Sequence, residues 1–308
     1  MPAEEEHDAV IVGAGPAGVS CALECHDIQL DTVVLEAAGQ PGGQLTEIHH
    51  SIRNVAAGRF ADGRALREAL EESAAILGPR LRRGEHVTRV DAAGGFVELA
   101  GGARVRGRAL VIATGSARQE LAAAPDGAFG GDVTYGIESR PDQFAGLDVV
   151  VIGGGDSATL DALELARRGS TVQLVHRAPA LTARDDIIDQ VRREQRIADL
   201  AGWELESVHG AEHLEEVTLT RATGERMRVR ARGVVVKIAR RPRSGAVSGQ
   251  LDLDRTGAII VDGHLRTSTP GVFAAGDVVA DAYARVAAAL GQGSLAARSV
   301  LRHLQGRT

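Results

Sequence analysis

Three glycines near the start of the chain have the spacing of a dinucleotide-binding turn. In GAGPAG, Gly13, Gly15 and Gly18 follow the apolar run AVIV and precede a segment whose apolar residues recur at helical spacing. The first glycine permits a tight turn, the second lets a pyrophosphate approach the backbone, and the third lets the helix pack closely on a sheet. Glu36 ends the next apolar run and can accept hydrogen bonds from a ribose diol. This segment therefore predicts a dinucleotide site, with the pyrophosphate at the start of the helix.

The same arrangement occurs a second time, with a different charge at its end. Gly153, Gly155 and Ala158 lie in GGGDSA, after the run VVVI, and the following strand TVQLVH ends at His176 and precedes Arg177. An acid at this place favours a free 2′-hydroxyl, whereas arginine suits a 2′-phosphate. The alternative is that Arg177 is a solvated surface side chain. Two units with opposite charge at the ribose predict two different dinucleotides.

Cys21 and Cys25 are the two cysteines of the chain. They share one face of the first predicted helix, so a redox dithiol is one interpretation. We favour the other, because free cysteine behaves as a small buried apolar residue and a helix holds such a pair near the upper limit for a disulfide. With no disulfide framework, a reducing compartment fits best.

Further strands return to the first unit and define the domains. Residues 109–116, ALVIATGS, and 267–279, TSTPGVFAAGDVV, are apolar runs that end in small-residue turns, and an apolar helix over 284–304 follows. We predict an α/β fold of two Rossmann-like dinucleotide-binding domains, the second inserted into the first. One domain comprises residues 1–116 and 241–308, and the inserted domain comprises residues 117–240.

Composition narrows the classes of function. The 308 residues are 44% hydrophobic with a net charge of −6, and the basic residues do not cluster, which argues against nucleic-acid binding. Lys237 is the single lysine, a bias that we ascribe to codon usage. No apolar run approaches the ~20 residues of a membrane span, and the acidic start MPAEEEHD does not resemble a signal peptide. We expect a cytoplasmic protein without a metal site.

On these motifs the chain resembles the low-molecular-weight thioredoxin reductases, over essentially its whole length. The resemblance rests on six motifs: GAGPAG, PGGQL at 41–45, ATG at 113–115, GGGDSA at 153–158, VHR at 175–177 and GVFAAGD at 271–277. It implies that the outer domain binds FAD, that the inserted domain binds NADPH, and that the protein is a homodimer.

The resemblance also implies roles for individual residues. Glu36 would hold the ribose of the FAD adenosine, and Gln44 and Asn54 would lie near the isoalloxazine. Val87 would meet the adenine through its backbone, and Asp277 the ribityl chain or pyrophosphate. The full predicted cofactor set is Gly13, Gly15, Pro16, Ala17, Gly18, Glu36, Ala37, Gly43, Gln44, Leu45, Asn54, Val87, Ala113, Thr114, Gly115, Gly153, Gly155, Asp156, Ser157, Ala158, His176, Arg177, Arg184, Gly276, Asp277, Tyr283, Arg285 and Val286.

The most consequential departure from the family lies in VTYGIESR, residues 133–140. The family carries a Cys-x-x-Cys-Asp sequence before the GGG turn, and this chain has Gly136, Ser139 and Arg140 at the corresponding places. Both sulfurs and the acid are therefore replaced. Reduced flavin would have to deliver its electrons directly to an acceptor.

Two more departures affect the nucleotide and the flavin. The family pattern HRRDxFRA is HRAPALTA here, so Ala178 and Thr182 replace two arginines that bind phosphate, and Arg184 compensates in part. The preference for NADPH should be weaker than in the family, and use of NADH is expected to be possible. In YARV, Ala284 replaces the arginine that follows Tyr283.

Three residues are candidates for catalysis. His49 and His50 follow the PGGQL turn, where they would line the flavin edge and transfer protons, or serve as ordinary loop histidines. Tyr135 precedes the vacant cysteine position, where it would stack on the flavin or be a core tyrosine with a satisfied hydroxyl.

We predict a flavin-dependent NAD(P)H oxidoreductase that passes electrons directly from FAD to an acceptor. The acceptor is expected to be a small redox protein such as ferredoxin or flavodoxin, a quinone or another small oxidant. One alternative is a thiol-disulfide reductase that uses Cys21 and Cys25. The other is a non-catalytic FAD-binding protein.

Overall fold

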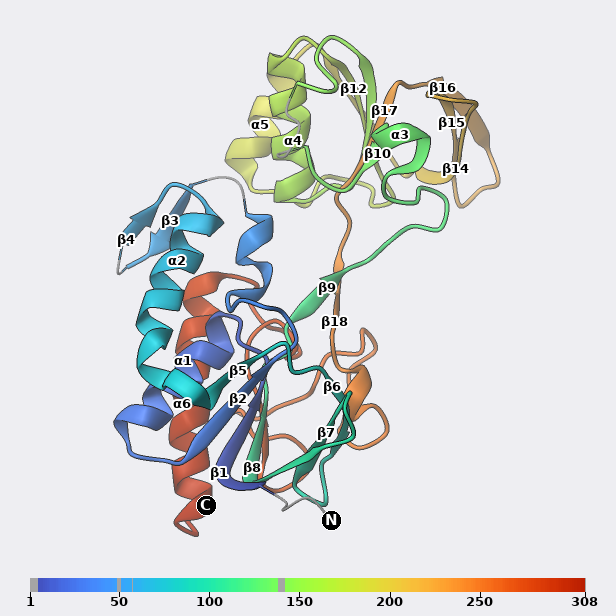
Figure 1. The fold of residues 1–308 in the computed structure, drawn as a ribbon. Coiled ribbons are helices and arrows are strands. Elements are labelled where there is room, and N and C mark those ends of the chain that lie inside the picture. The colour runs from blue at the N-terminus through green and yellow to red at the C-terminus, as the bar shows by residue number, and fades with distance from the viewer. Residues whose placement is uncertain (1–4, 49–50, 57, 138–141, 308) are drawn as a thin grey trace. The chain divides into compact units, whose positions relative to one another are not determined.

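The computed structural model describes residues 5–48, 51–56, 58–137 and 142–307. The chain forms two compact units, one made of Met1–Ala117 with Arg241–Thr308 and the other of Arg118–Arg240 (Figure 1). We call them unit 1 and unit 2. Where the chain passes between them, β9 (Ser116–Arg118) pairs with β18 (Arg240–Pro242).

Unit 1 is built on a seven-stranded sheet of order β5-β2-β1-β8-β7-β6, with β19 also paired to β8. Strands β1, β2, β5, β8 and β19 pair in parallel, and β6 and β7 add to the sheet antiparallel. Parallel strands in register bring their carboxyl ends to one edge, where α/β proteins bind ligands. The strands are β1 (Glu5–Val12), β2 (Thr32–Glu36), β5 (Leu81–Arg83), β6 (Val87–Asp91), β7 (Phe96–Leu99), β8 (Arg104–Ile112) and β19 (Val272–Ala274).

Both faces of this sheet are covered, which explains the unbroken apolar runs of its central strands. Ala9 and Ile11 of β1 face the helices α1 (Pro16–Asp27), α2 (Gly63–Ala74) and α6 (Val286–Leu304), which lie together on one side (Figure 1). Val10 and Val12 face the opposite layer, formed by β6, β7 and the loops after residue 245. The smaller elements are η1 (Gly43–Glu47), η2 (Ala75–Arg80), η3 (Gly245–Val247) and the hairpin of β3 (Ile52–Val55) and β4 (Gly58–Phe60).

Unit 2 repeats the architecture with an all-parallel sheet of order β10-β17-β11-β12-β13. Helices α4 (Asp156–Arg167) and α5 (Asp185–Arg193) pack on one face. The antiparallel sheet of β14 (Glu204–Gly210), β15 (Leu214–Thr220) and β16 (Arg226–Arg230) packs on the other. The remaining elements are β10 (Val133–Thr134), β11 (Asp148–Ile152), β12 (Thr171–His176), β13 (Ile197–Ala201), β17 (Gly233–Val236) and the short α3 (Ala128–Gly131).

These two Rossmann-like sheets confirm the predicted α/β fold class. No helix in the described part of the chain is both long and apolar enough to cross a membrane.

Two small residues let α1 and α6 approach each other closely in unit 1. A Cβ atom on Gly293 of α6 would lie 2.2 Å from the Ala17 carbonyl oxygen and 2.8 Å from Ser20 Cβ. The Ser20 hydroxyl donates a hydrogen bond to the Leu290 carbonyl, 2.7 Å away, across the same contact. The backbones of α1, which follows the first glycine turn, and α6 are therefore in direct contact.

We predict that Gly293→Ala lowers the free energy of unfolding by about 1–3 kcal/mol, because the new methyl group overfills this contact. Gly291 lies on the same helix with no atom within 4 Å of a Cβ placed on it. Gly291→Ala is therefore the control and should be neutral or slightly stabilising. Urea unfolding of the two variants measures the difference, and equal changes would contradict the packing described here.

Candidate functional site

The carboxyl ends of the parallel strands of unit 1 surround a cavity. It is lined by Gly13, Gly15, Pro16, Ala17, Glu36, Gly43, Gln44, Leu45, Ile48, Ala113, Thr114, Gly115, Ser116, Arg243, Ala275, Gly276, Asp277, Ala284, Arg285, Val286 and Ala289. Segments far apart in sequence meet here, because β1, β8 and β19 end at the same edge of the sheet. This edge is where an α/β fold binds its ligand.

The glycine turn forms the floor of the cavity. Gly13 has φ +102°, and a Cβ on it would lie 2.6 Å from the Ala113 carbonyl oxygen. A Cβ on Gly18 would lie 1.9 Å from the Gly13 carbonyl oxygen, so the helix approaches the strand as closely as backbone allows. Gly15 has no atom within 4 Å of its Cβ position and is the N-cap of α1. The first amides of α1 thus face open space that a phosphate can fill.

Glu36 is fixed at the rim of the cavity by two backbone amides. The Ala14 N–H donates to Oε2 at 2.7 Å, and the Ala38 N–H donates to Oε1 at 2.8 Å. Each carboxylate oxygen keeps a lone pair, and the side chain is oriented before any ligand arrives. The arrangement suits acceptance of two hydrogen bonds from a ribose diol.

A polar network closes the other side of the cavity. The Gln44 amide nitrogen donates to the Ser116 hydroxyl at 3.0 Å and to Asp277 Oδ2 at 3.1 Å. The Gly276 N–H donates to the Gln292 side-chain oxygen of α6 at 2.7 Å. The network ties η1, β9, the turn after β19 and α6 into one wall.

The cavity includes most of the cofactor residues predicted in unit 1, but not all. Gly18, Ala37, Asn54 and Val87 do not line it: Gly18 is buried against the turn, Ala37 and Asn54 are exposed, and Val87 lies half-buried in β6. Tyr283 also lies outside the lining and is 70% exposed, with the Arg285 guanidinium 5.1 Å from its ring centroid. Their roles remain predictions that the cavity does not support.

Sequence reasoning missed six lining residues: Ile48, Ser116, Arg243, Ala275, Ala284 and Ala289. Ser116 and Ala275 adjoin recognised motifs and could have been added on that ground. Arg243 follows β18, far along the chain from every motif of unit 1, and its N–H donates to the Gly115 carbonyl at 2.9 Å. No sequence pattern predicts the contact between Arg243 and Gly115.

Unit 2 repeats the glycine turn at the end of β11. Gly153 has φ +136°, and a Cβ on it would lie 2.1 Å from the Lys237 carbonyl oxygen. Gly155 is the N-cap of α4, and Ala158 is fully buried where the helix meets the sheet. Asp156 accepts the Arg184 N–H at 2.9 Å and lies 3.3 Å from its Nε. Arg184 is thereby held at the start of α4; Ser157, also predicted, is exposed beside it.

His176 takes the place in unit 2 that Glu36 takes in unit 1, as the last residue of the second strand. Its Nε2 lies 2.7 Å from Asp199 Oδ1, and its side chain is 3% exposed. Its Nδ1 has no hydrogen-bond partner among the described residues and would lie 3.4 Å from a Cβ on Gly154. A buried, unpaired nitrogen beside the turn fits a site completed by a ligand.

Arg177 is exposed, and in the described part of the chain it has no hydrogen bond or ion pair. Both interpretations of this side chain, a phosphate ligand and a solvated arginine, therefore stay open. Thr182, at a position where the family has arginine, instead donates its N–H to the Gly154 carbonyl at 2.8 Å.

The structure favours the core interpretation of Tyr135. Its hydroxyl accepts the Leu121 N–H at 2.6 Å and donates to the Ala124 carbonyl at 3.1 Å. Its ring packs in the core of unit 2 beneath the Arg118 guanidinium, and burial raises the pKa of Tyr135. With 4% of the residue exposed, stacking on a flavin finds no support here.

Four residues named in the sequence analysis lie outside the described residues: His49, His50, Ser139 and Arg140. Gly136 is described, and its N–H donates to the Thr134 hydroxyl at 3.2 Å.

Cys21 and Cys25 are free, fully buried thiols in the core between α1 and its neighbours. The hydrogen bond with Cys25, together with burial, raises the pKa of Cys21 well above its ordinary value. Since the thiolate is the reactive form, Cys21 is in the environment of an inert core thiol.

Comparison with known proteins agrees with this geometry. The family model described as pyridine nucleotide-disulphide oxidoreductase matches residues 7–293. The chain belongs to this family. It is 32% identical to a thioredoxin reductase of Streptomyces clavuligerus, over 96% of this chain and 94% of that protein, and 29% identical to one of Listeria innocua, over 99% and 96%. A crystal structure of Lactococcus lactis thioredoxin reductase superposes with a TM-score of 0.85 at 27% identity, covering 97% of this chain and 99% of that one.

Membership confirms the family resemblance seen in the sequence and makes the protein a thioredoxin reductase-like oxidoreductase. These flavoproteins use FAD and NADPH. The cavity of unit 1 fits FAD by its own chemistry, because it offers an open glycine turn at a helix start and a carboxylate preset for a ribose. The turn of unit 2 fits a second dinucleotide for the same reason.

We predict that Glu36→Ala weakens FAD binding about ten- to a hundredfold, because a charge-assisted acceptor for the ribose is lost. Fluorescence titration of apoprotein with FAD measures this. Glu68 is an exposed carboxylate of α2 that pairs with Arg64, so Glu68→Ala is the control and should bind FAD as the wild type does. Equal affinities in the two variants would exclude Glu36 as a cofactor ligand.

Proposed function

We propose that this protein is an NAD(P)H oxidoreductase in which bound FAD passes electrons directly to an acceptor, without a dithiol between them. The observation that carries the proposal is the distribution of sulfur. The chain has two cysteines, both buried in α1, and residues 136–139 read GIES where the family has its Cys-x-x-Cys. When bound, FAD supplies the step that links a hydride donor to other electron acceptors.

Unit 1 would bind FAD and unit 2 the nicotinamide nucleotide, so the FAD domain is residues 1–116 with 241–308 and the NAD(P)H domain is 117–240. The contrast at the end of the second strand of each unit supports this assignment. Unit 1 has the carboxylate of Glu36, oriented by two amides, whereas unit 2 has His176 and the exposed Arg177. A carboxylate suits a free diol, and an arginine guanidinium suits a 2′-phosphate.

The residues of unit 1 would bind and orient the flavin. Glu36 would hold the adenosine ribose, and the amides at the start of α1 would neutralise the pyrophosphate. Gln44 and Asp277, fixed on each other, would set the wall against which the rest of the cofactor lies. Those contacts would hold the flavin in one orientation, and the acceptor would take electrons from it directly.

The two alternative functions have weaker support. A thiol-disulfide reductase would need an accessible thiolate, yet Cys21 and Cys25 are completely buried and the pKa of Cys21 is raised. A non-catalytic FAD-binding protein would not need a second dinucleotide site. Unit 2 nevertheless has a complete glycine turn at the start of α4 and the exposed Arg177 nearby.

We infer that the acceptor is a small redox protein or a small molecule, in the class of ferredoxin, flavodoxin or quinone. The family that the chain resembles carries a Cys-x-x-Cys dithiol, and this sequence contains no Cys-x-x-Cys. We expect a homodimer, as the family resemblance implies. We also expect a reducing compartment such as the cytoplasm, because both cysteines are free thiols.

Anaerobic addition of NADPH to the FAD-loaded protein tests the proposal. We expect the flavin absorption band to bleach, and to return when ferricyanide or a quinone is added. A band that NADPH and NADH leave unchanged would contradict oxidoreductase activity and favour the non-catalytic alternative.

Replacing both cysteines tests the dithiol alternative. We predict that the Cys21→Ala, Cys25→Ala variant keeps the wild-type rate of quinone reduction, because neither thiol lines the cavity of unit 1 and both are buried. Neither protein should reduce thioredoxin at a useful rate. Thioredoxin reduction by the wild type that disappears in the double variant would identify α1 as the carrier of a displaced dithiol.

Arg177→Ala should raise the KM for NADPH about tenfold and leave the KM for NADH nearly unchanged, because the guanidinium would face a group that only NADPH carries. Arg192, an exposed arginine of α5, provides the matched control as Arg192→Ala. Equal changes for both nucleotides would remove Arg177 from the phosphate site and make Arg184 the next residue to replace.

A further inference from the structure

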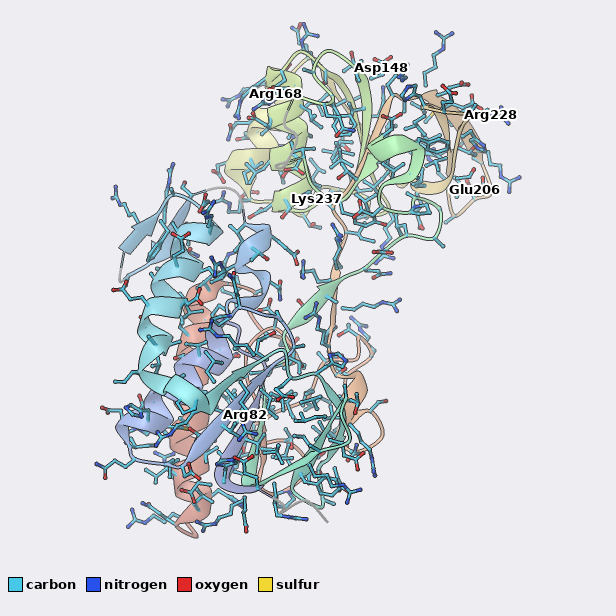
Figure 2. The ribbon with its side chains drawn as sticks, viewed as in Figure 1. Arg82, Asp148, Arg168, Glu206, Arg228 and Lys237 are labelled. Atoms are coloured by element: carbon cyan, nitrogen blue, oxygen red, sulfur yellow. The ribbon has the colours of Figure 1, made fainter. Side chains whose placement is uncertain are left out.

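Lys237 is the single lysine in a chain with 35 lysine and arginine residues. Codon bias accounts for the arginines but leaves this one exception unexplained. The residue lies in unit 2, immediately after β17, where the chain leaves the parallel sheet (Figure 2).

The backbone of Lys237 contacts the second glycine turn. Its N–H donates to the Ile152 carbonyl at 2.7 Å, which extends the pairing with β11 one residue beyond the end of β17. Its own carbonyl oxygen would lie 2.1 Å from a Cβ on Gly153. The lysine is thus adjacent to the turn that precedes α4.

The side chain reaches the helix that follows this turn. Lys237 Nζ lies 3.2 Å from Oδ2 of Asp161, a residue of α4, and the two side chains are 15% and 14% exposed. Removing two charges from water costs free energy that their attraction only partly returns, so such a pair is weak evidence of a purely stabilising role. It does place one ammonium group beside the first turns of α4.

The strand order says which part of a dinucleotide would meet that ammonium. Strand β11 lies between β12 and β17, and the crevice at such a topological switch point holds the dinucleotide. The end of β12, with His176 and Arg177, is the adenosine ribose side. The end of β17, with Lys237, is therefore the nicotinamide side of the pyrophosphate.

We propose that Lys237, held in place by Asp161, binds the pyrophosphate of the nicotinamide nucleotide on its nicotinamide side. Lysine is a point charge that suits phosphate oxygens, and the pyrophosphate is common to NADH and NADPH. The role differs from that of Arg177, which would sense only the 2′-phosphate. It rests on the assignment of unit 2 to NAD(P)H under the proposed function.

The uniqueness of Lys237 makes a direct test possible. Reductive methylation of the FAD-loaded protein modifies amines, so its targets are Lys237, the single lysine, and the N-terminal α-amino group of the protein. We expect NADP⁺ to protect Lys237 and to leave the α-amino group equally reactive, as measured by peptide mass spectrometry. Lys237 that is methylated to the same extent with and without saturating NADP⁺ would overturn the proposal.

Substitution supplies the second test, by titration of NADP⁺ and NAD⁺ into the oxidised, FAD-loaded protein. Lys237→Met should raise both dissociation constants by a similar factor, about tenfold or more, whereas Asp161→Asn should raise them less. The Lys237→Met, Asp161→Asn variant also replaces the carboxylate that loses its ion pair with Lys237, so its melting temperature should recover while its affinity stays low.

Affinity that recovers together with the melting temperature would make the pair purely structural and overturn the proposal. Failure of this proposal can be told apart from failure of the proposed function. If NADPH cannot bleach the flavin of the wild-type protein, the proposed function itself is refuted. Flavin that saturating NADPH bleaches in wild type and variants alike, with unchanged dissociation constants, refutes only the role of Lys237.

Discussion

The structure depends on two places where backbone packs against backbone with no room for a side chain. In unit 1 a Cβ on Gly13 would lie 2.6 Å from the Ala113 carbonyl oxygen, and in unit 2 a Cβ on Gly153 would lie 2.1 Å from the Lys237 carbonyl oxygen. Each contact turns the chain from a buried strand directly into a helix whose first amides remain open. That turn creates a place for a pyrophosphate, and the surrounding residues decide what else is bound there.

What differs between the two turns is the charge around them. In unit 1 a carboxylate is locked by two amides at 2.7 and 2.8 Å, whereas in unit 2 the equivalent place holds His176 backed by Asp199 at 2.7 Å. One fold used twice would thus present a carboxylate to one ribose, and His176 with the exposed Arg177 to the other. The two nucleotides of a hydride-transfer pair would be sorted by these few groups, because the glycine turns themselves do not distinguish them.

Much of this architecture could be predicted because it is local. The spacing of Gly13, Gly15 and Gly18 and the apolar runs on either side determine a strand, turn and helix within about thirty residues. The wall of the cavity could not be predicted, since Gln44, Ser116 and Asp277 meet through contacts between segments more than seventy residues apart. Tyr135 could not be placed from the sequence either. Its position before the replaced cysteine suggests a flavin contact, whereas in the structure its side chain packs in the core of unit 2.

The central claim is that electrons leave the flavin directly for an external acceptor and do not pass through a protein disulfide. The electron capacity of the FAD-loaded protein tests it most directly, by anaerobic titration with a reductant such as dithionite. A flavin takes up one pair of electrons and a redox-active disulfide takes up another. Our account predicts that one pair per FAD completes the reduction, with no thiols released. Uptake of a second pair per FAD, with new titratable thiols, would contradict it.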